Sequence, residues 1–338
     1  MNDSPGDPST TARPTLKTIA YMTGLGVTTV SRALSDAPDI SQSTKERVRL
    51  VANQIGYRPN RAGVRLRTGK TNVISLILSI ETEVLGLTSH LVYGLSERLR
   101  ASPYHLIVTP YSVDDNSLDP VRYIVETGSA DGVVFSRIEP RDARVQYLHE
   151  RGFPFATHGR STMGIDHAFF DYDNQAYGET AVRLLAERGR RRLALLPPPA
   201  HLTYATHMLV GFTSGLARHD LLEVPLHQVT SDSPHEKIMS VITEMMTSPN
   251  RPDGIVCASA SSAIAVISAA EDAGLVIGRD FDVAVKDAFN MMRKFRREVI
   301  VLHEDFRAAG LGLADAVLRL IDGENATGQQ IIQPPRPG

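Results

Sequence analysis

Residues 27–34 are the first segment with a recognisable chemical pattern. They read Val-Thr-Thr-Val-Ser-Arg-Ala-Leu. Val30, Ala33 and Leu34 recur at the spacing of one apolar helix face, which we expect to be buried. The polar positions outside that face are Thr28, Thr29, Ser31 and Arg32. Small hydroxyl groups and arginine on an exposed helix can read base edges in the major groove of DNA. This helix is therefore our first candidate for a contact with duplex DNA.

Two neighbouring helices would hold this candidate helix in place. Residues 16–34 read as two short helices separated by Gly24-Leu25-Gly26. A third helix follows Ser41, a residue type that caps helix N-termini, and it has one apolar face. The apolar residues of that third helix are Val48, Val51, Ala52 and Ile55. We expect a small three-helix unit that presents its second helix outward.

The charge of the chain is divided between this unit and the rest. Residues 1–70 contain 11 Lys and Arg against five Asp and Glu, a net charge of +6, whereas the remainder carries −8. A basic segment attached to an acidic body indicates a polyanionic partner for the basic segment only. Charge alone leaves open the alternative of a solvated basic face without a partner.

Residues 15–62 resemble the N-terminal signature of the LacI/GalR transcriptional regulators. The matching stretches are residues 15–20, Gly24 with residues 27–34, Ile40-Ser41 with Thr44, and residues 56–62. The resemblance implies that residues 27–34 form the recognition helix of a helix-turn-helix. It assigns base-reading positions to Val27, Thr28 and Arg32, and phosphate-binding positions to Thr15, Thr29, Ser41 and Asn60. Gly26 departs from the family pattern, which usually has a serine N-cap there.

Residues 59–70 are basic and contain no acidic side chain. In the LacI/GalR family this segment is a hinge helix that becomes ordered on DNA. The resemblance implies that Arg61 belongs to the DNA contact and that Leu66 is the leucine wedged between base steps of the minor groove. Gly63 stands where the family usually has alanine, which makes helix formation costlier by about 1 kcal/mol. A plain basic linker is the alternative reading.

Beyond residue 71, short apolar runs alternate with helical stretches. We expect strands at residues 73–78, 106–109, 132–135, 155–157, 193–196, 254–257, 281–285 and 299–302. The helices include residues 85–100, 176–188, 262–273 and 308–322. This alternation predicts parallel sheets covered on both faces, and the length exceeds one comfortable core. We therefore expect an α/β body of two doubly wound lobes, and the family resemblance implies the fold of periplasmic sugar-binding proteins.

These patterns divide the chain into four expected parts. Residues 1–14 form a disordered tail, 15–58 the helix-turn-helix, 59–70 the hinge, and 71–338 the effector-binding and dimerisation domain. Within that domain we expect a first lobe of about 71–170 with 303–327, and a second lobe of about 171–302 with 328–338.

Ligands of open parallel sheets bind beyond the carboxyl ends of the strands. The polar residues that follow the expected strands, together with positions suggested by the family, give an effector site. Its candidate residues are Glu81, Ser136, His158, Tyr204, His207, Ser259 and Asp287. Asp287 matches the family acid that often holds a sugar hydroxyl, whereas Met208 replaces the family's effector arginine and leaves His207 as a neighbour that could compensate. We expect a small-molecule effector and favour a sugar.

Composition and motifs exclude several other classes. With 42% apolar and 22% charged residues the chain is typical of globular proteins, and no apolar run approaches the roughly 18 residues of a membrane helix. The single Cys257 excludes a disulfide framework and a multi-cysteine metal site. No catalytic constellation is evident, because residues 211–215 have threonine where a nucleophile elbow needs serine. We expect a cytoplasmic protein that is not an enzyme and needs no metal or cofactor.

Together these observations predict a homodimeric regulator, expected to be a repressor, that binds a palindromic double-stranded operator and responds to the small molecule. A palindromic site mirrors the two-fold symmetry of a dimer. The alternative is a sugar-binding receptor that never contacts DNA, which would need an export signal and no basic helical unit. A sugar-modifying enzyme is a third reading, which turnover of a sugar would favour.

Overall fold

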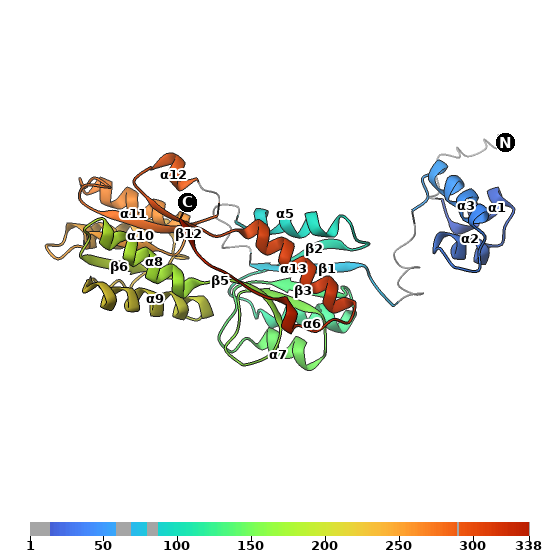
Figure 1. Ribbon diagram of the computed structural model, residues 1–338, viewed down its shortest axis with the longest axis horizontal. Coiled ribbons are helices and arrows are strands. Elements are labelled where there is room, and N and C mark those ends of the chain that lie inside the picture. Colours follow the sequence, from blue (N-terminus) through green and yellow to red (C-terminus); the bar gives the residue numbers. More distant parts are fainter. Residues whose placement is uncertain (1–13, 59–68, 80–86, 289–290, 338) are drawn as a thin grey trace, which may run out of the picture. The chain divides into compact units, whose positions relative to one another are not determined.

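A computed structural model of the chain describes residues 14–58, 69–79, 87–288 and 291–337. The chain divides into two compact units, Met1–Thr71 and Asn72–Gly338. Figure 1 shows the first unit as a helical bundle and the second as layers of helices and strands. Most of the expected hinge, residues 59–68, lies outside the described residues, as do residues 1–13 of the expected tail.

The first unit consists of α1 (Leu16–Thr23), α2 (Val27–Leu34) and α3 (Gln42–Gln54). Its core takes side chains from all three helices, since each presents apolar residues at helical spacing. The buried residues are Ile19, Ala20, Val30, Ala33, Val48 and Ala52. The predicted three-helix unit is therefore confirmed.

Local capping explains where these helices begin and end. The Thr15 hydroxyl accepts a hydrogen bond from the backbone N–H of Thr18 at 3.3 Å, and Ser41 caps α3 in the same way. Gly24 ends α1 with φ of 67°, a left-handed conformation that glycine adopts without strain. Gly26 precedes α2 and makes no side-chain cap, as expected from the missing serine.

The second unit contains two six-stranded sheets. The first has the strand order β11-β5-β4-β3-β1-β2, and all of its described pairings are parallel. Its strands are β1 (Val73–Ser79), β2 (His105–Tyr111), β3 (Gly132–Phe135), β4 (Phe155–His158), β5 (Ala168–Tyr172) and β11 (Gln330–Gln333). The register of the central pair aligns Ile74 with Gly132.

The second sheet has the order β12-β10-β9-β8-β6-β7, and only β12 pairs antiparallel among its described strands. Its strands are β6 (Arg192–Leu196), β7 (Leu222–Glu223), β8 (Gly254–Cys257), β9 (Asp282–Asp287), β10 (Ile300–His303) and β12 (Arg336–Pro337). The eight expected strands are all present. The strands β5, β7, β11 and β12 were not expected, because β7 and β12 are two residues long and the other two lack a distinct run of aliphatic residues.

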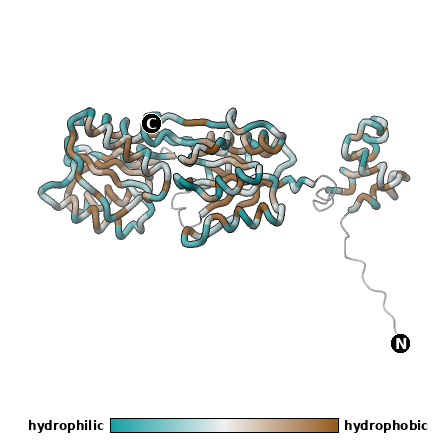
Figure 2. The backbone as a smooth tube through the Cα atoms, turned by 90° about the horizontal axis from the view of Figure 1, so that it is seen from below, coloured by the Kyte–Doolittle hydropathy of each residue, from teal (hydrophilic) through white to brown (hydrophobic). Residues whose placement is uncertain are grey.

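Helices cover both faces of each sheet, which confirms the doubly wound architecture. The first sheet packs against α5 (Leu87–Leu99) and α13 (Phe306–Ile321) on one face, and against α6 (Leu118–Thr127) and α7 (Ala143–Glu150) on the other. The second sheet lies between two further helix pairs. These are α8 (Asn174–Glu187) with α9 (Thr203–His219), and α10 (His235–Thr247) with α11 (Ala260–Asp272). In Figure 2 the segments inside each lobe of the second unit are mainly brown, whereas the segments at the surface show both colours.

The chain crosses between the lobes three times, after β5, after β10 and after β11. The assignment of residues 328–338 to the second lobe is wrong for β11, which extends the first sheet by pairing with β5. The Gln330 side chain fixes this position, because its amide donates to Asp166 at 2.7 Å and to the backbone oxygen of His167. Of the strands within residues 328–338, only β12 belongs to the second sheet. Two shorter elements complete the described part of the unit, α12 (Met292–Phe295) and η1 (Thr327–Gln329).

Among the residues that the structure describes, no helix has the length and apolar character needed to cross a membrane.

Candidate recognition helix and ligand cleft

The outer face of α2 carries the side chains singled out from the sequence. Val27, Thr28 and Arg32 are exposed, whereas Thr29 is half-buried. The Arg32 guanidinium donates from Nη2 to Asp39 Oδ1 at 2.5 Å, and this hydrogen bond holds the pKa of the Asp39 carboxyl below its usual value. The helix therefore offers an apolar group, a hydroxyl and a guanidinium on one solvent-exposed surface.

Two of the predicted phosphate contacts also have a local structural role. Thr15 and Ser41 are exposed, and each hydroxyl accepts a hydrogen bond at a helix N-terminus. Backbone N–H groups at such a terminus attract anions, so the two positions suit a phosphate. The predicted roles of Asn60, Arg61, Leu66 and Glu81 concern positions outside the described residues, and they remain predictions.

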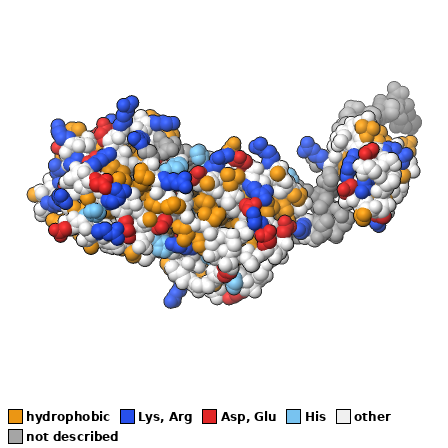
Figure 3. Space-filling model, in the orientation of Figure 1, with side chains coloured by type: hydrophobic (Ala, Val, Ile, Leu, Met, Phe, Trp, Pro, Cys, Tyr) orange, Lys and Arg blue, Asp and Glu red, His pale blue; other side chains and the backbone are white. Residues whose placement is uncertain are grey.

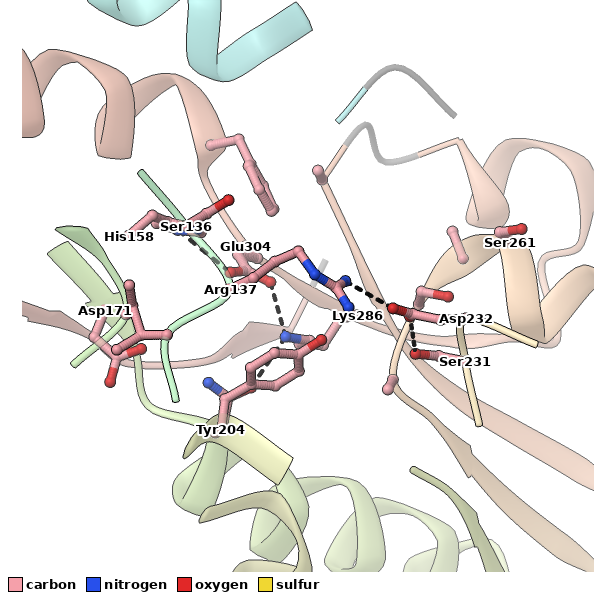
Figure 4. A pocket seen from close by; sticks show the side chains of 18 of the residues that line it. Ser136, Arg137, His158, Asp171, Tyr204, Ser231, Asp232, Ser261, Lys286 and Glu304 are labelled. Atoms are coloured by element: carbon pink, nitrogen blue, oxygen red, sulfur yellow. Dashed lines mark hydrogen bonds and ion pairs between the residues drawn. The ribbon is translucent and has the colours of Figure 1, made fainter. Parts of the chain in front are cut away.

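A cavity of about 240 Å³ lies between the two lobes of the second unit, where the carboxyl ends of the strands of both sheets meet. The first lobe contributes the loop after β3 and residues of β4, β5 and α13. The second lobe contributes residues of α9 and β9, the residue after β10, and the loops before α10 and α11. Figure 4 labels Ser136, Arg137, His158, Asp171, Tyr204, Ser231, Asp232, Ser261, Lys286 and Glu304 in this cleft. Of the predicted effector residues, Ser136, His158, Tyr204 and Ser259 line the cavity.

Three cationic side chains line the described part of the cleft, and each has a carboxylate partner. Arg137 Nη1 lies 2.7 Å from Asp232 Oδ2. Arg160 Nε lies 3.1 Å from Asp171 Oδ2, and Lys286 Nζ lies 3.0 Å from Glu304 Oε2. The cleft is thus rich in charge but balanced between the two signs.

Lys286 is held in a fixed position at the centre of the cleft. Its ammonium group donates to Asn174 Oδ1 at 3.0 Å and lies 5.1 Å from the centre of the Tyr204 ring, within the range of a cation–π contact. Its partner Glu304 is also within 3.8 Å of His158 Nε2. Because Lys286 belongs to β9 and His158 to β4, this group of charges connects the two lobes.

Burial changes the ionisation of two groups in the first lobe. The Asp171 carboxyl is 5% exposed, and burial raises its pKa to about 7 even though Arg160 opposes the shift. Burial likewise lowers the pKa of His158, so the neutral imidazole is favoured. The His158 ring lies 5.0 Å from the Phe306 ring, centre to centre. The cleft therefore combines hydrogen-bonding groups with aromatic surfaces.

Two of the predicted effector residues that the structure describes do not line the cavity, and Asp287 is the first. The strand β9 continues to Asp287, two residues beyond its expected end, and side chains alternate along a strand. Lys286 therefore faces the cleft and Asp287 faces away, where its carboxylate accepts a hydrogen bond from the backbone N–H of Met292 at 2.9 Å. A lysine beside an apolar strand was the signal in the sequence that could have identified Lys286.

His207 is the second residue outside the cavity lining. Its neighbour Met208 is fully buried among Tyr172, Tyr177 and Phe212, so position 208 belongs to the core of the second lobe. A methionine suits that apolar environment, and the expected compensation by His207 has no support from its position. The strand-end reasoning also missed Asp171, because β5 itself was not expected.

Comparison with known proteins agrees with this architecture. Residues 15–60 match the family described as bacterial regulatory proteins, lacI family, and residues 182–337 match the periplasmic binding protein-like domain. The lac repressor dimer bound to operator and an anti-inducer has a TM-score of 0.83 at 19% identity, covering 96% of this chain and 98% of that one. The CelR–cellobiose complex has a TM-score of 0.69 at 20% identity, with the same coverage. At this level of sequence identity, the two structures show that the chain shares their fold.

Two relatives of higher sequence identity show the family to which the chain belongs. The transcriptional regulator AglR of Rhizobium meliloti is 32% identical over 320 residues, which are 91% of this chain and 87% of that protein. The regulator RafR of Escherichia coli is 31% identical, covering 95% of this chain and 96% of the relative. With an exposed recognition helix, a bilobed ligand cleft and this identity along nearly its whole length, the chain belongs to the lacI family of DNA-binding transcriptional regulators, which are not enzymes.

Proposed function

We propose that this regulator is a cytoplasmic repressor that reads a palindromic operator with α2 and responds to a small neutral carbohydrate in the cleft. The observation that carries the DNA-binding half is the exposed face of α2. Val27 suits a thymine methyl group, Thr28 suits either base-edge donors or acceptors, and Arg32 suits guanine. Thr15, Thr29, Ser41 and Asn60 would contact phosphates, while Arg61 and Leu66 would act from the hinge.

The pairing of charges in the cleft favours a neutral ligand. Each of the cations Arg137, Arg160 and Lys286 already has a carboxylate partner within 3.1 Å. An anionic ligand would have to displace one of these carboxylates, whereas the hydroxyl groups of a sugar can add hydrogen bonds to both signs. The rings of Tyr204 and Phe306 would lie against the apolar face of a sugar. One structural neighbour, the regulator CelR, forms a complex with cellobiose, which supports this ligand class.

Exposed apolar side chains on the second unit support a homodimer. In β2, the edge strand of the first sheet, Ile107 and Val108 are each 45% exposed, and on α5 Tyr93 is 56% exposed. On the other lobe, Ile264 of α11 is 43% exposed. An uncovered edge strand with apolar side chains is a surface that another chain usually covers. Figure 3 shows charges of both signs interspersed over one face of the second unit.

A ligand between lobes that are joined by three segments would change the angle of one lobe against the other. In a dimer, such a change alters the spacing of the two hinges, and with it the free energy of ordering residues 59–70 on DNA. The ligand then either releases the operator or strengthens its binding, according to which lobe arrangement it stabilises.

The test is a genomic-fragment selection with purified full-length protein, followed by a thermal-shift screen of mono- and disaccharides. We expect one class of palindromic fragments to be enriched over bulk DNA, and at least one neutral sugar both to raise the melting temperature and to change operator affinity. Sugar binding without any preference among DNA fragments would instead favour the receptor alternative. Chemical conversion of the sugar would contradict both.

A further inference from the structure

The loop after β3 joins the two lobes at two adjacent residues. The Arg137 guanidinium lies 2.7 Å from the Asp232 carboxylate, and the backbone oxygen of Ile138 accepts a hydrogen bond from the N–H of Thr203 at 2.8 Å. Arg137 and Ile138 belong to the first lobe, whereas Thr203 and Asp232 belong to the second. Figure 4 shows the Arg137 side chain reaching across the cleft to Asp232.

The conformation of Arg137 is imposed by its surroundings. Its φ of 57° is in the left-handed region, which is costly for a residue with a long side chain. The buried Arg144 guanidinium donates to the backbone oxygen of Arg137 at 2.9 Å and is itself held by Asp142. Backbone strain maintained by a buried anchor is common at functional sites. The anchor aims the Arg137 side chain into the cleft.

Asp232 is also held in place by its own loop. Ser231 Oγ donates to Asp232 Oδ1 at 2.9 Å, and the N–H of Ser231 donates to the backbone oxygen of Pro197 at 2.8 Å. The side chains of Arg137 and Asp232 are 18% and 25% exposed. A partly desolvated ion pair of this kind is stronger than one on the open surface.

We propose that Asp232 is a specificity-determining residue that excludes anionic ligands from the cleft. A planar guanidinium is the group best suited to bind a phosphate or carboxylate. In this cleft the Arg137 guanidinium is already paired with the Asp232 carboxylate. A phosphorylated sugar would have to displace Asp232 and leave that charge without its partner. Exclusion by an unfavourable interaction of this kind is a recognised source of specificity.

Asp232 is the carboxylate best placed for this role. The other two cleft acids that neutralise cations, Asp171 and Glu304, are 5% and 8% exposed and belong to the buried charge group between the lobes. Asp232 instead lies in a loop at the cleft wall and is more exposed. The inference rests on the proposed function only in treating the cleft as the ligand site.

The test compares binding of glucose 6-phosphate and glucose by calorimetry to full-length wild-type protein and to Asp232→Asn. We expect the variant to bind glucose 6-phosphate about ten- to a hundredfold more tightly than wild type, because Arg137 is released for a charge-assisted hydrogen bond. The double variant Arg137→Asn/Asp232→Asn should lose this gain, since asparagine tolerates the left-handed backbone but supplies no cation. Asp119→Asn, which frees Arg122 from an exposed ion pair, is the matched control and should bind neither compound more tightly.

Wild-type protein that binds glucose 6-phosphate as tightly as Asp232→Asn, or a folded Asp232→Asn that shows no gain, would overturn the inference. Melting temperatures establish folding, and Asp232→Ser provides a second neutral variant if asparagine is not tolerated. Operator binding is measured in parallel on the same samples. A gain of anion affinity in protein without operator preference would contradict the proposed function and leave the role of Asp232 intact.

Discussion

Arg144 Nη2 donates a 2.9 Å hydrogen bond to the backbone carbonyl of Arg137, so one arginine holds the main chain of another at the wall of the cleft. The Arg144 side chain is 2% exposed, pairs with Asp142 at 2.6 Å, and lies 4.6 Å from the centre of the Phe135 ring. A buried ion pair contributes little net stability, but either charge without its partner is strongly destabilising. The buried pair therefore holds the backbone of Arg137, at the wall of the cleft, against the core of the first lobe.

Replacement of Arg144 by methionine should lower the free energy of unfolding by about 3–5 kcal/mol, because Asp142 is left as a buried charge. Urea unfolding of the full-length chain measures this change. The control is Arg183→Met, which breaks an exposed pair with Glu187 and should change stability by about 0.5 kcal/mol or less. Similar losses in the two variants would show that the burial of Arg144 has no energetic consequence.

The raised pKa of Asp171 predicts a pH dependence of stability. Between about pH 4 and its folded pKa of about 7, the folded chain keeps a proton on Asp171 that the unfolded chain releases. The free energy of unfolding therefore falls as the pH rises through this window, by a few kcal/mol, and becomes level above it. Burial is the main cause of the raised pKa; Glu304 adds to it, whereas Arg160 and Lys286 oppose it.

The comparison that isolates this group is the difference in unfolding free energy between Asp171→Asn and wild type. We expect the difference to move in favour of Asp171→Asn as the pH is raised from 4 to 8, because the amide carries no charge to desolvate. A difference that stays constant across this range would mean that folding does not raise the pKa of Asp171.

Arg32→Ala should weaken binding to the selected operator by about 1–3 kcal/mol and relax the base preference at one position of each half-site. Removal of a base-reading side chain has this effect, whereas loss of a phosphate contact weakens binding to every sequence alike. Fluorescence anisotropy with operator and with random DNA separates the two. Arg47→Ala, at an exposed position of α3, serves as the control. An equal loss of affinity for operator and for random DNA in Arg32→Ala would contradict base reading by Arg32.

Close contact between α8 and α9 predicts that Gly211→Ala is destabilising. A Cβ atom at position 211 would overlap the backbone carbonyl of Gln175, and neither helix backbone can move without disturbing the core. Overpacking of this kind costs about 1–3 kcal/mol or more. Gly328→Ala, where a Cβ atom would meet nothing within 4 Å, should leave the melting temperature nearly unchanged. A wild-type melting temperature for Gly211→Ala would show that the helices can separate freely.

The features that depend on neighbours along the chain could be predicted from the sequence. Helical spacing and the cap at Ser41 predicted the three-helix unit and the outward face of α2. Runs of aliphatic residues located the eight principal strands, because a strand buried on both faces is apolar throughout. The same strands located four cavity-lining residues, since the carboxyl ends of parallel strands meet at one edge.

Which groups from distant parts of the chain come into contact depends on the tertiary fold. Arg137 and Asp232 are 95 residues apart and come from different lobes, and Lys286 of β9 meets Glu304, which follows the neighbouring strand β10. Whether Lys286 or Asp287 faces the ligand depended on where β9 ends, because a shift of one residue turns every side chain to the other face. Charge pairing in the cleft, and with it the ligand class that the site can accept, arises from the packing of two lobes and not from any local pattern.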